Sequence, residues 1–97
     1  MVKEVIKLGA TWCQPCKAFS SVMKRVAGDD KYKTIEFKDL DVEDDDEGVR
    51  LSDKYGVRSV PTTLILDENM EVVTKVMGAT SESSFRATLD KAIEESK

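Results

Sequence analysis

The hydrophobic positions of this chain change their period along its length, and the changes divide it into alternating strands and helices. Residues 2–9 carry apolar side chains on both faces of an extended segment, at Val5, Ile6 and Leu8, as a central strand does. Between residues 13 and 27 the apolar positions recur at three- and four-residue spacing. This second pattern predicts an amphipathic helix that ends at Gly28.

The middle of the chain predicts a second strand and a short helix. Residues 34–42 show apolar and polar positions in a strand-like pattern. The acidic run 44–47 then suits the solvated start of a helix, because carboxylates are stabilised at the positive end of the helix dipole. A metal or partner site at this run is the alternative. The helix carries Val49, Leu51 and Tyr55 and ends at Gly56.

The last third of the chain predicts a hairpin and a final helix. Residues 62–66 and 72–76 read as two strands around a turn at 67–69. Ser81 or Thr80 is expected to cap the helix that follows. Its apolar stripe comprises Phe85, Leu89, Ala92 and Ile93.

The predicted element order is βαβαββα. Strands joined through a helix lie parallel with a right-handed crossover, and the strands of a hairpin lie antiparallel. We therefore expect an α/β fold with a four-stranded mixed sheet and helices on both faces. A chain of 97 residues with 40% hydrophobic residues supports one core, so we expect a single domain over residues 1–97.

Composition narrows the function. The net charge of −4 argues against a nucleic-acid surface or attraction to anionic membranes. No apolar run approaches the length of a membrane span, and the charged residues near Met1 do not suit a targeting signal, so we expect a cytoplasmic location. The absence of histidine removes His-based metal sites and catalytic triads, and we expect no cofactor.

The two cysteines stand together in the segment Trp12-Cys13-Gln14-Pro15-Cys16, between the first strand and the first helix. This order places the first sulfur at the helix N-terminus, where unpaired N–H groups and the helix dipole stabilise a thiolate. Cys13 is then the expected nucleophile, and Cys16, one turn later, attacks the mixed disulfide. A zinc site is the alternative, but one pair supplies only two of four ligands.

Three segments resemble the thioredoxin family in family order: residues 12–17, residues 54–62 and residues 75–79. The similarity runs over nearly the whole chain and begins after the usual first strand and helix, so the chain resembles a short form with the thioredoxin-like fold. The resemblance implies a thiol–disulfide oxidoreductase with Cys13 attacking and Cys16 resolving. It also implies protein-disulfide substrates, a flavin-containing thioredoxin reductase and a monomer.

The resemblance also implies that four further residues belong to the site. Pro61 should be a cis-proline that faces the disulfide, and Val60 should offer its backbone groups to an extended substrate. Gly78 would leave room for a partner chain, or is a turn glycine. Trp12 would be a contact platform for partners, or fills the core.

The chain departs from the family pattern at two places. Gln14-Pro15 stands between the cysteines where thioredoxins usually have Gly-Pro. Lys7 stands six residues before the first cysteine, where the family has a buried aspartate, and Asp39 stands where a lysine is common. We expect an exchanged ion pair beneath the cysteines that assists proton transfer at Cys16; the alternative is a Lys7 that reaches solvent and an Asp39 at the strand end.

Two other functions stay open on the sequence. A glutaredoxin-type protein would use glutathione, although nothing in the sequence resembles a glutathione cradle. A thioredoxin-fold binding subunit would keep its function without its cysteines.

Overall fold

The computed structural model describes all 97 residues and contains the predicted elements in the predicted order. The elements are β1 (Val2–Gly9), α1 (Gln14–Ala27), a 3₁₀ turn (Asp30–Tyr32), β2 (Glu36–Asp41), α2 (Asp46–Lys54), β3 (Thr62–Asp67), β4 (Val72–Met77) and α3 (Glu82–Glu95). The second strand shows a clear shift from the predicted boundaries, because it begins at Glu36 rather than at Thr34. None of the helices is long and apolar enough to cross a membrane.

The sheet has the order β2-β1-β3-β4. Strand β1 runs parallel to β2 and antiparallel to β3, and β4 returns antiparallel to β3, which confirms the predicted mixed sheet. The two inner strands are buried almost throughout, whereas the two edge strands are only partly buried. In this register Lys7 of β1 lies directly beside Asp39 of β2.

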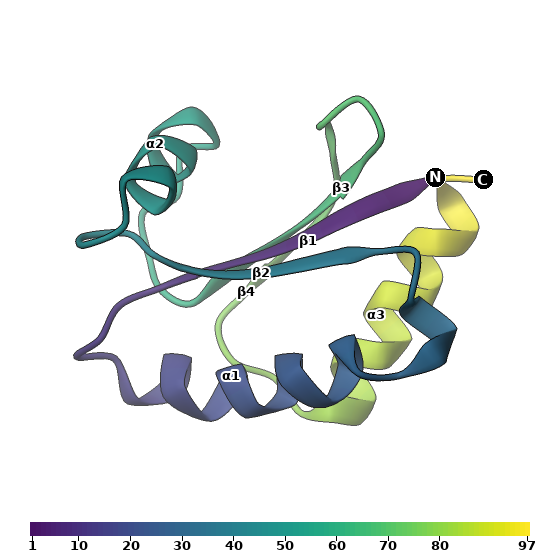
Figure 1. Ribbon diagram of the computed structural model, residues 1–97, viewed down its shortest axis with the longest axis horizontal. Coiled ribbons are helices and arrows are strands. Elements are labelled where there is room, and N and C mark those ends of the chain that lie inside the picture. Colours follow the sequence, from purple (N-terminus) through teal and green to yellow (C-terminus); the bar gives the residue numbers. More distant parts are fainter.

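Helices cover both faces of the sheet, as predicted. Helices α1 and α3 lie on one face and α2 lies on the other (Figure 1). The larger core lies under α1 and α3, where Phe19 and Phe85 meet edge to face with ring centroids 5.2 Å apart. The smaller core lies under α2 around Leu51, whereas Val49 of the same helix is 38% exposed.

The acidic run after β2 forms the start of α2, as its helix-dipole interpretation predicts. Asp45 caps the helix, and its carboxylate accepts a hydrogen bond from the backbone N–H of Glu47 at 3.0 Å. Gly48 packs directly on the end of β2, where a β-carbon would collide with the carbonyl group of Asp41. The close approach requires glycine and fixes α2 against the strand that carries Asp39.

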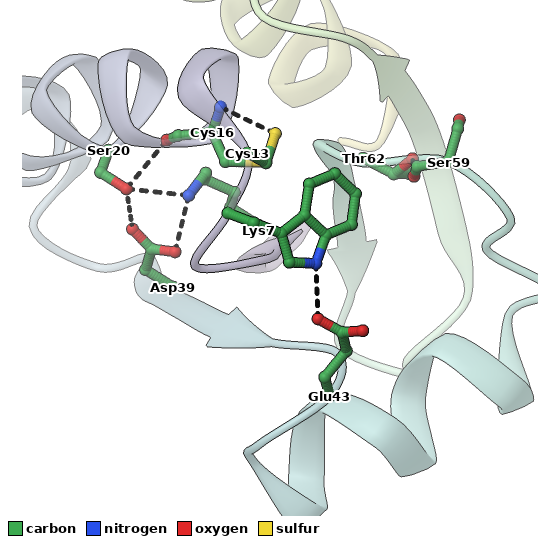
Figure 2. The surroundings of a disulfide bond; sticks show 9 residues. Lys7, Cys13, Cys16, Ser20, Asp39, Glu43, Ser59 and Thr62 are labelled. Atoms are coloured by element: carbon green, nitrogen blue, oxygen red, sulfur yellow. Dashed lines mark hydrogen bonds and ion pairs between the residues drawn. A yellow bond between two sulfur atoms is a disulfide. The ribbon is translucent and has the colours of Figure 1, made fainter.

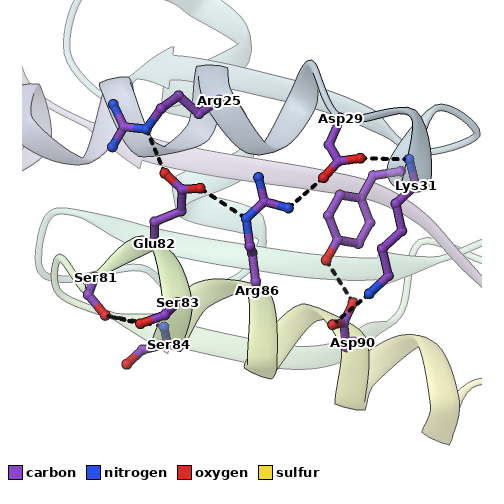
Figure 3. Close-up of polar contacts among 10 residues, drawn as sticks. Arg25, Asp29, Lys31, Ser81, Glu82, Ser83, Ser84, Arg86 and Asp90 are labelled. Atoms are coloured by element: carbon purple, nitrogen blue, oxygen red, sulfur yellow. Dashed lines mark hydrogen bonds and ion pairs between the residues drawn. The ribbon is translucent and has the colours of Figure 1, made fainter.

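An ion-pair network connects α1 and the following loop to α3 (Figure 3). Arg86 donates to Asp29 at 2.7 Å and to Glu82 at 3.0 Å, and Arg25 pairs with Glu82. The backbone N–H of Lys31 and the guanidinium of Arg86 lower the pKa of Asp29. Arg25 and Arg86 likewise lower the pKa of Glu82, so both carboxylates favour the folded state while ionised.

Candidate active site

The two cysteines form a disulfide at the start of α1. Cys13 is the N-cap residue in an extended conformation, and Pro15 occupies the first turn, where its missing N–H costs no hydrogen bond. The backbone N–H of Cys16 donates to Cys13 Sγ at 3.2 Å. The first sulfur therefore receives a helix N-terminal donor, as the order of strand, cysteine pair and helix predicts.

The surroundings of the disulfide are closed on most sides. Cys13 is 5% exposed and Cys16 is 2% exposed, so exposure distinguishes the two sulfurs only slightly. The N-cap hydrogen bond is the feature that separates them. Ala10 and Val60 complete the small apolar cluster around the pair.

Trp12 projects from this cluster and is 67% exposed, which excludes its interpretation as core filler. Its indole Nε1 donates to Glu43 Oε1 at 2.7 Å (Figure 2). A groove of about 430 Å³ runs beside this tryptophan and is also lined by Val60 and Arg58. Glu43 was not predicted from the sequence, because only the folded loop after β2 brings it to Trp12.

The Val60–Pro61 peptide bond is cis, as predicted. The backbone N–H and carbonyl of Val60 make no hydrogen bond within the chain. Gly78 donates its backbone N–H to the carbonyl of Pro61 at 2.8 Å and has φ +85°, a conformation that favours glycine. Apart from Gly78 and its two chain neighbours, no residue has an atom within 4 Å of the place where a β-carbon on Gly78 would stand, so this glycine is both a turn residue and open on one side.

Lys7 and Asp39 form the ion pair that the sequence predicts, with Nζ and Oδ1 2.9 Å apart. The Lys7 side chain is 3% exposed and that of Asp39 is 41% exposed. The alternative in which Lys7 reaches solvent is therefore wrong. Asp39 lies less deep than its partner because β2 is an edge strand.

Ser20 completes this ion pair and was not predicted. Its hydroxyl lies 2.8 Å from Lys7 Nζ and 2.6 Å from Asp39 Oδ2, and it also approaches the carbonyl oxygen of Cys16 at 3.1 Å (Figure 2). Ser20 stands four residues after Cys16, hence one turn further along the same face of α1. This spacing is the signal that sequence reasoning missed.

A cavity of about 390 Å³ opens between the start of α1 and β2. Lys7, Gly9, Cys16, Ser20 and Asp39 are among its lining residues, so the ion pair and the second sulfur share one polar recess. No group of three or more cysteine or acidic side chains that could hold a metal ion occurs in the structure.

Asp41 also lines this recess and organises the loop after β2. Its carboxylate accepts backbone N–H groups of Asp44 at 2.9 Å and of Glu43 at 2.7 Å. These hydrogen bonds lower the pKa of Asp41. The same carboxylate thus fixes the start of the loop that carries Glu43.

A Cys-x-x-Cys disulfide at a helix start, on a four-stranded mixed sheet and packed against the residue that precedes a cis-proline, defines a thiol–disulfide oxidoreductase. Comparison with known proteins agrees, since residues 2–91 match the family model described as Thioredoxin. The chain belongs to the thioredoxin family.

Individual relatives support the same assignment. The chain is 36% identical over 88 residues to a thioredoxin of Staphylococcus epidermidis, covering 91% of this chain and 80% of that protein. It is 35% identical over 75 residues to Thioredoxin Asp f 29 of Aspergillus fumigatus, covering 77% of this chain and 64% of that protein.

Solved structures show the same fold. The thioredoxin Mala s 13 of Malassezia sympodialis superposes with a TM-score of 0.78 at 26% identity, covering 92% of this chain and 73% of that one. The thioredoxin NaTrxh of Nicotiana alata gives a TM-score of 0.77 at 30% identity, covering 95% and 75% of the two chains.

Proposed function

We propose that this chain reduces disulfide bonds of other proteins, with Cys13 as the attacking and Cys16 as the resolving cysteine. The observation that carries the proposal is the hydrogen bond from the Cys16 backbone N–H to Cys13 Sγ at the N-cap of α1. In the reduced protein the same donor and the helix dipole favour a thiolate on Cys13.

The reaction consists of two exchanges. The Cys13 thiolate attacks one sulfur of the substrate disulfide, forms a mixed disulfide and releases the other sulfur as a thiolate. The Cys16 thiolate then attacks Cys13 Sγ, which closes the Cys13–Cys16 disulfide and releases the second substrate thiolate. Two electrons pass from the cysteine pair to the substrate.

The substrate would lie as an extended segment across Trp12, Val60, Pro61 and Gly78. Support comes from the unpaired backbone N–H and carbonyl of Val60, which are suited to pairing with a strand-like segment. The exposed face of Trp12 and the groove beside it offer apolar contact. The open side of Gly78 leaves space for the partner backbone.

Lys7 and Asp39 would assist the second exchange. Asp39 would accept the proton of the Cys16 thiol, directly or through water, while Lys7 holds the carboxylate in place. The shared recess beside Cys16 supports this assignment.

A flavin-containing thioredoxin reductase would return the disulfide to the dithiol, so that the chain transfers electrons between two proteins. The family resemblance supports this partner. We further propose that the chain acts as a cytoplasmic monomer. The only two cysteines form the redox pair, which agrees with a compartment where structural disulfides are rare.

Insulin reduction with dithiothreitol as the electron donor tests the proposal. The parent chain is expected to accelerate precipitation of the insulin B chain, and Cys13→Ser is expected to abolish the acceleration. Equal acceleration by the Cys13→Ser/Cys16→Ser variant would contradict the proposal and favour a binding role. Efficient turnover with glutathione and glutathione reductase, without thioredoxin reductase, would favour the glutaredoxin-type alternative.

A further inference from the structure

The ammonium group of Lys7 is buried beside the sulfur of the second cysteine. Gly9 lies two residues after Lys7 on the same face of β1 and leaves space because it has no side chain. A β-carbon on Gly9 would lie 3.3 Å from Lys7 Nζ and 3.1 Å from Cys16 Sγ. The two atoms therefore border the same small space beneath the first turn of α1.

Lys7 also has one N–H donor without an acceptor in the chain. An ammonium group has three donors, and Lys7 uses one toward Asp39 and one toward Ser20 (Figure 2). The side chain is 3% exposed, and a buried donor without an acceptor costs free energy. A negative charge on Cys16 Sγ, next to this donor, would offset that cost.

Ser20 and Asp39 fix where the ammonium group lies. The Ser20 hydroxyl accepts from Lys7 at 2.8 Å and donates to Asp39 Oδ2 at 2.6 Å, so the three side chains form a closed triangle. The other charged groups that line the recess are Lys17 and Asp41. Lys17 is exposed, so water screens its charge from the sulfur far more than it screens that of Lys7.

We propose that Lys7 is the counter-ion of the Cys16 thiolate and that Ser20 is a positioning residue for its ammonium group. Asp39 helps to hold the ammonium group beneath this sulfur and keeps its proposed role as acceptor of the Cys16 thiol proton. The inference deepens the proposed function and rests on it, because it concerns the second exchange. Cys16 carries a negative charge before it attacks the mixed disulfide at Cys13 and none afterwards. The electron pair and the charge leave with the substrate sulfur.

The consequence is a larger fraction of reactive Cys16 at neutral pH. A thiolate becomes less nucleophilic when the pKa of its thiol falls. On a logarithmic scale this loss of nucleophilicity is only about 0.4–0.5 of the gain in thiolate fraction. A cation at this position therefore accelerates the second exchange as long as Cys16 is mostly protonated at the working pH.

A titration of Cys16 alone tests the proposal. In the Cys13→Ser background, the ultraviolet absorbance of the thiolate is followed against pH, and the same curve for Cys13→Ser/Cys16→Ser is subtracted to remove tyrosine ionisation. Lys7→Met is expected to raise the midpoint by about one pH unit, which is a tenfold loss of thiolate below the midpoint. Lys7→Gln, which keeps a polar end in the recess without the charge, is expected to shift it in the same direction.

Asp39→Asn is expected to move the midpoint the other way, to lower pH, because it removes a negative charge and leaves the lysine. An electrostatic role predicts that the Lys7 and Asp39 variants shift the Cys16 midpoint in opposite directions. A loss of packing would shift the midpoint in the same direction in both variants. If Asp39→Asn does not fold, the two Lys7 variants decide the matter: a midpoint that stays or falls in both overturns the proposal.

Lys17→Met is the matched control, since it removes an exposed cation from the same recess. Its shift is expected to be well below that of Lys7→Met, and an equal shift would overturn the proposal. The titration needs neither substrate nor reductase, so an unchanged midpoint in Lys7→Met would refute the counter-ion role alone. If the proposed function were wrong, the parent protein would instead fail to reduce insulin.

Discussion

Removing one member of the Lys7–Asp39 pair is expected to have very unequal effects, depending on which charge remains. Asp39→Ala leaves an ammonium group that is 3% exposed, and an uncompensated buried charge costs about 3–5 kcal/mol. Lys7→Met leaves a carboxylate that is 41% exposed, which water can solvate, so the cost falls to about 1 kcal/mol or less. We expect Asp39→Ala to be the more destabilising change by about 2–4 kcal/mol.

The double variant makes the reasoning quantitative. Once methionine replaces Lys7, the recess holds no buried charge, and removal of Asp39 becomes nearly neutral. Adding Lys7→Met to Asp39→Ala should therefore restore about 2–4 kcal/mol of the free energy of unfolding.

Urea unfolding of the oxidised proteins, followed by far-ultraviolet circular dichroism, measures all four free energies. Lys38→Met on the same edge strand is a control for general charge loss, because Lys38 is 27% exposed and its partner Glu47 lies on α2. Equal small losses for the two single variants, with no recovery in the double variant, would refute the account of a buried ammonium group.

Further predictions concern the cysteines and the distal ion network. Iodoacetamide at neutral pH should alkylate Cys13 before Cys16 in the reduced protein, as judged by peptide mass spectrometry; modification of Cys16 first would contradict the N-cap argument. Cys16→Ser should accumulate mixed disulfides with cellular proteins on non-reducing gels, and recovery of only the free chain would count against protein substrates. Arg86→Met should be less stable than the parent at neutral pH, and the difference between their free energies of unfolding should shrink as the pH falls. The reason is that the carboxylates of Asp29 and Glu82 have lowered pKa values and stabilise the fold only while they are ionised. Parallel stability curves for parent and variant between about pH 5 and pH 2 would refute this assignment.

Much of the fold could be predicted because local signals and topology agree. The buried inner strand β1 reads as a continuous apolar run, and α1 and α3 read as stripes, so their positions follow from periodicity. The hairpin of β3 and β4 follows from the turn between two apolar runs. The start of the edge strand β2 differs from the prediction, because its residues are exposed or only partly buried and its hydrophobic pattern is correspondingly weak.

The chemistry of the site was predicted only in part. Cys13 and Cys16 follow from their place before a helix, and the Lys7–Asp39 pair follows from neighbouring strands and alternation. Ser20 and Glu43 could not be found in the same way. Their partners lie 13 to 31 residues away, and the contacts depend on how α1 and the loop after β2 pack in the folded chain.

How deeply the Asp39 side chain is buried could be determined only from the structure. Strand alternation places its side chain on the face covered by α1 but does not show that β2 ends the sheet on that side. The edge position leaves the side chain of Asp39 41% exposed, whereas that of Lys7 is 3% exposed.

The reduction potential of the Cys13–Cys16 pair tests the central claim most directly. Equilibration in buffers of dithiothreitol or glutathione, with the reduced fraction determined by alkylation and mass spectrometry, gives the potential of a two-electron couple. A protein-disulfide reductase is expected to show one reversible transition near about −270 mV, whereas an oxidant lies near about −120 mV. A transition close to the second value, or no reversible transition, would contradict the account.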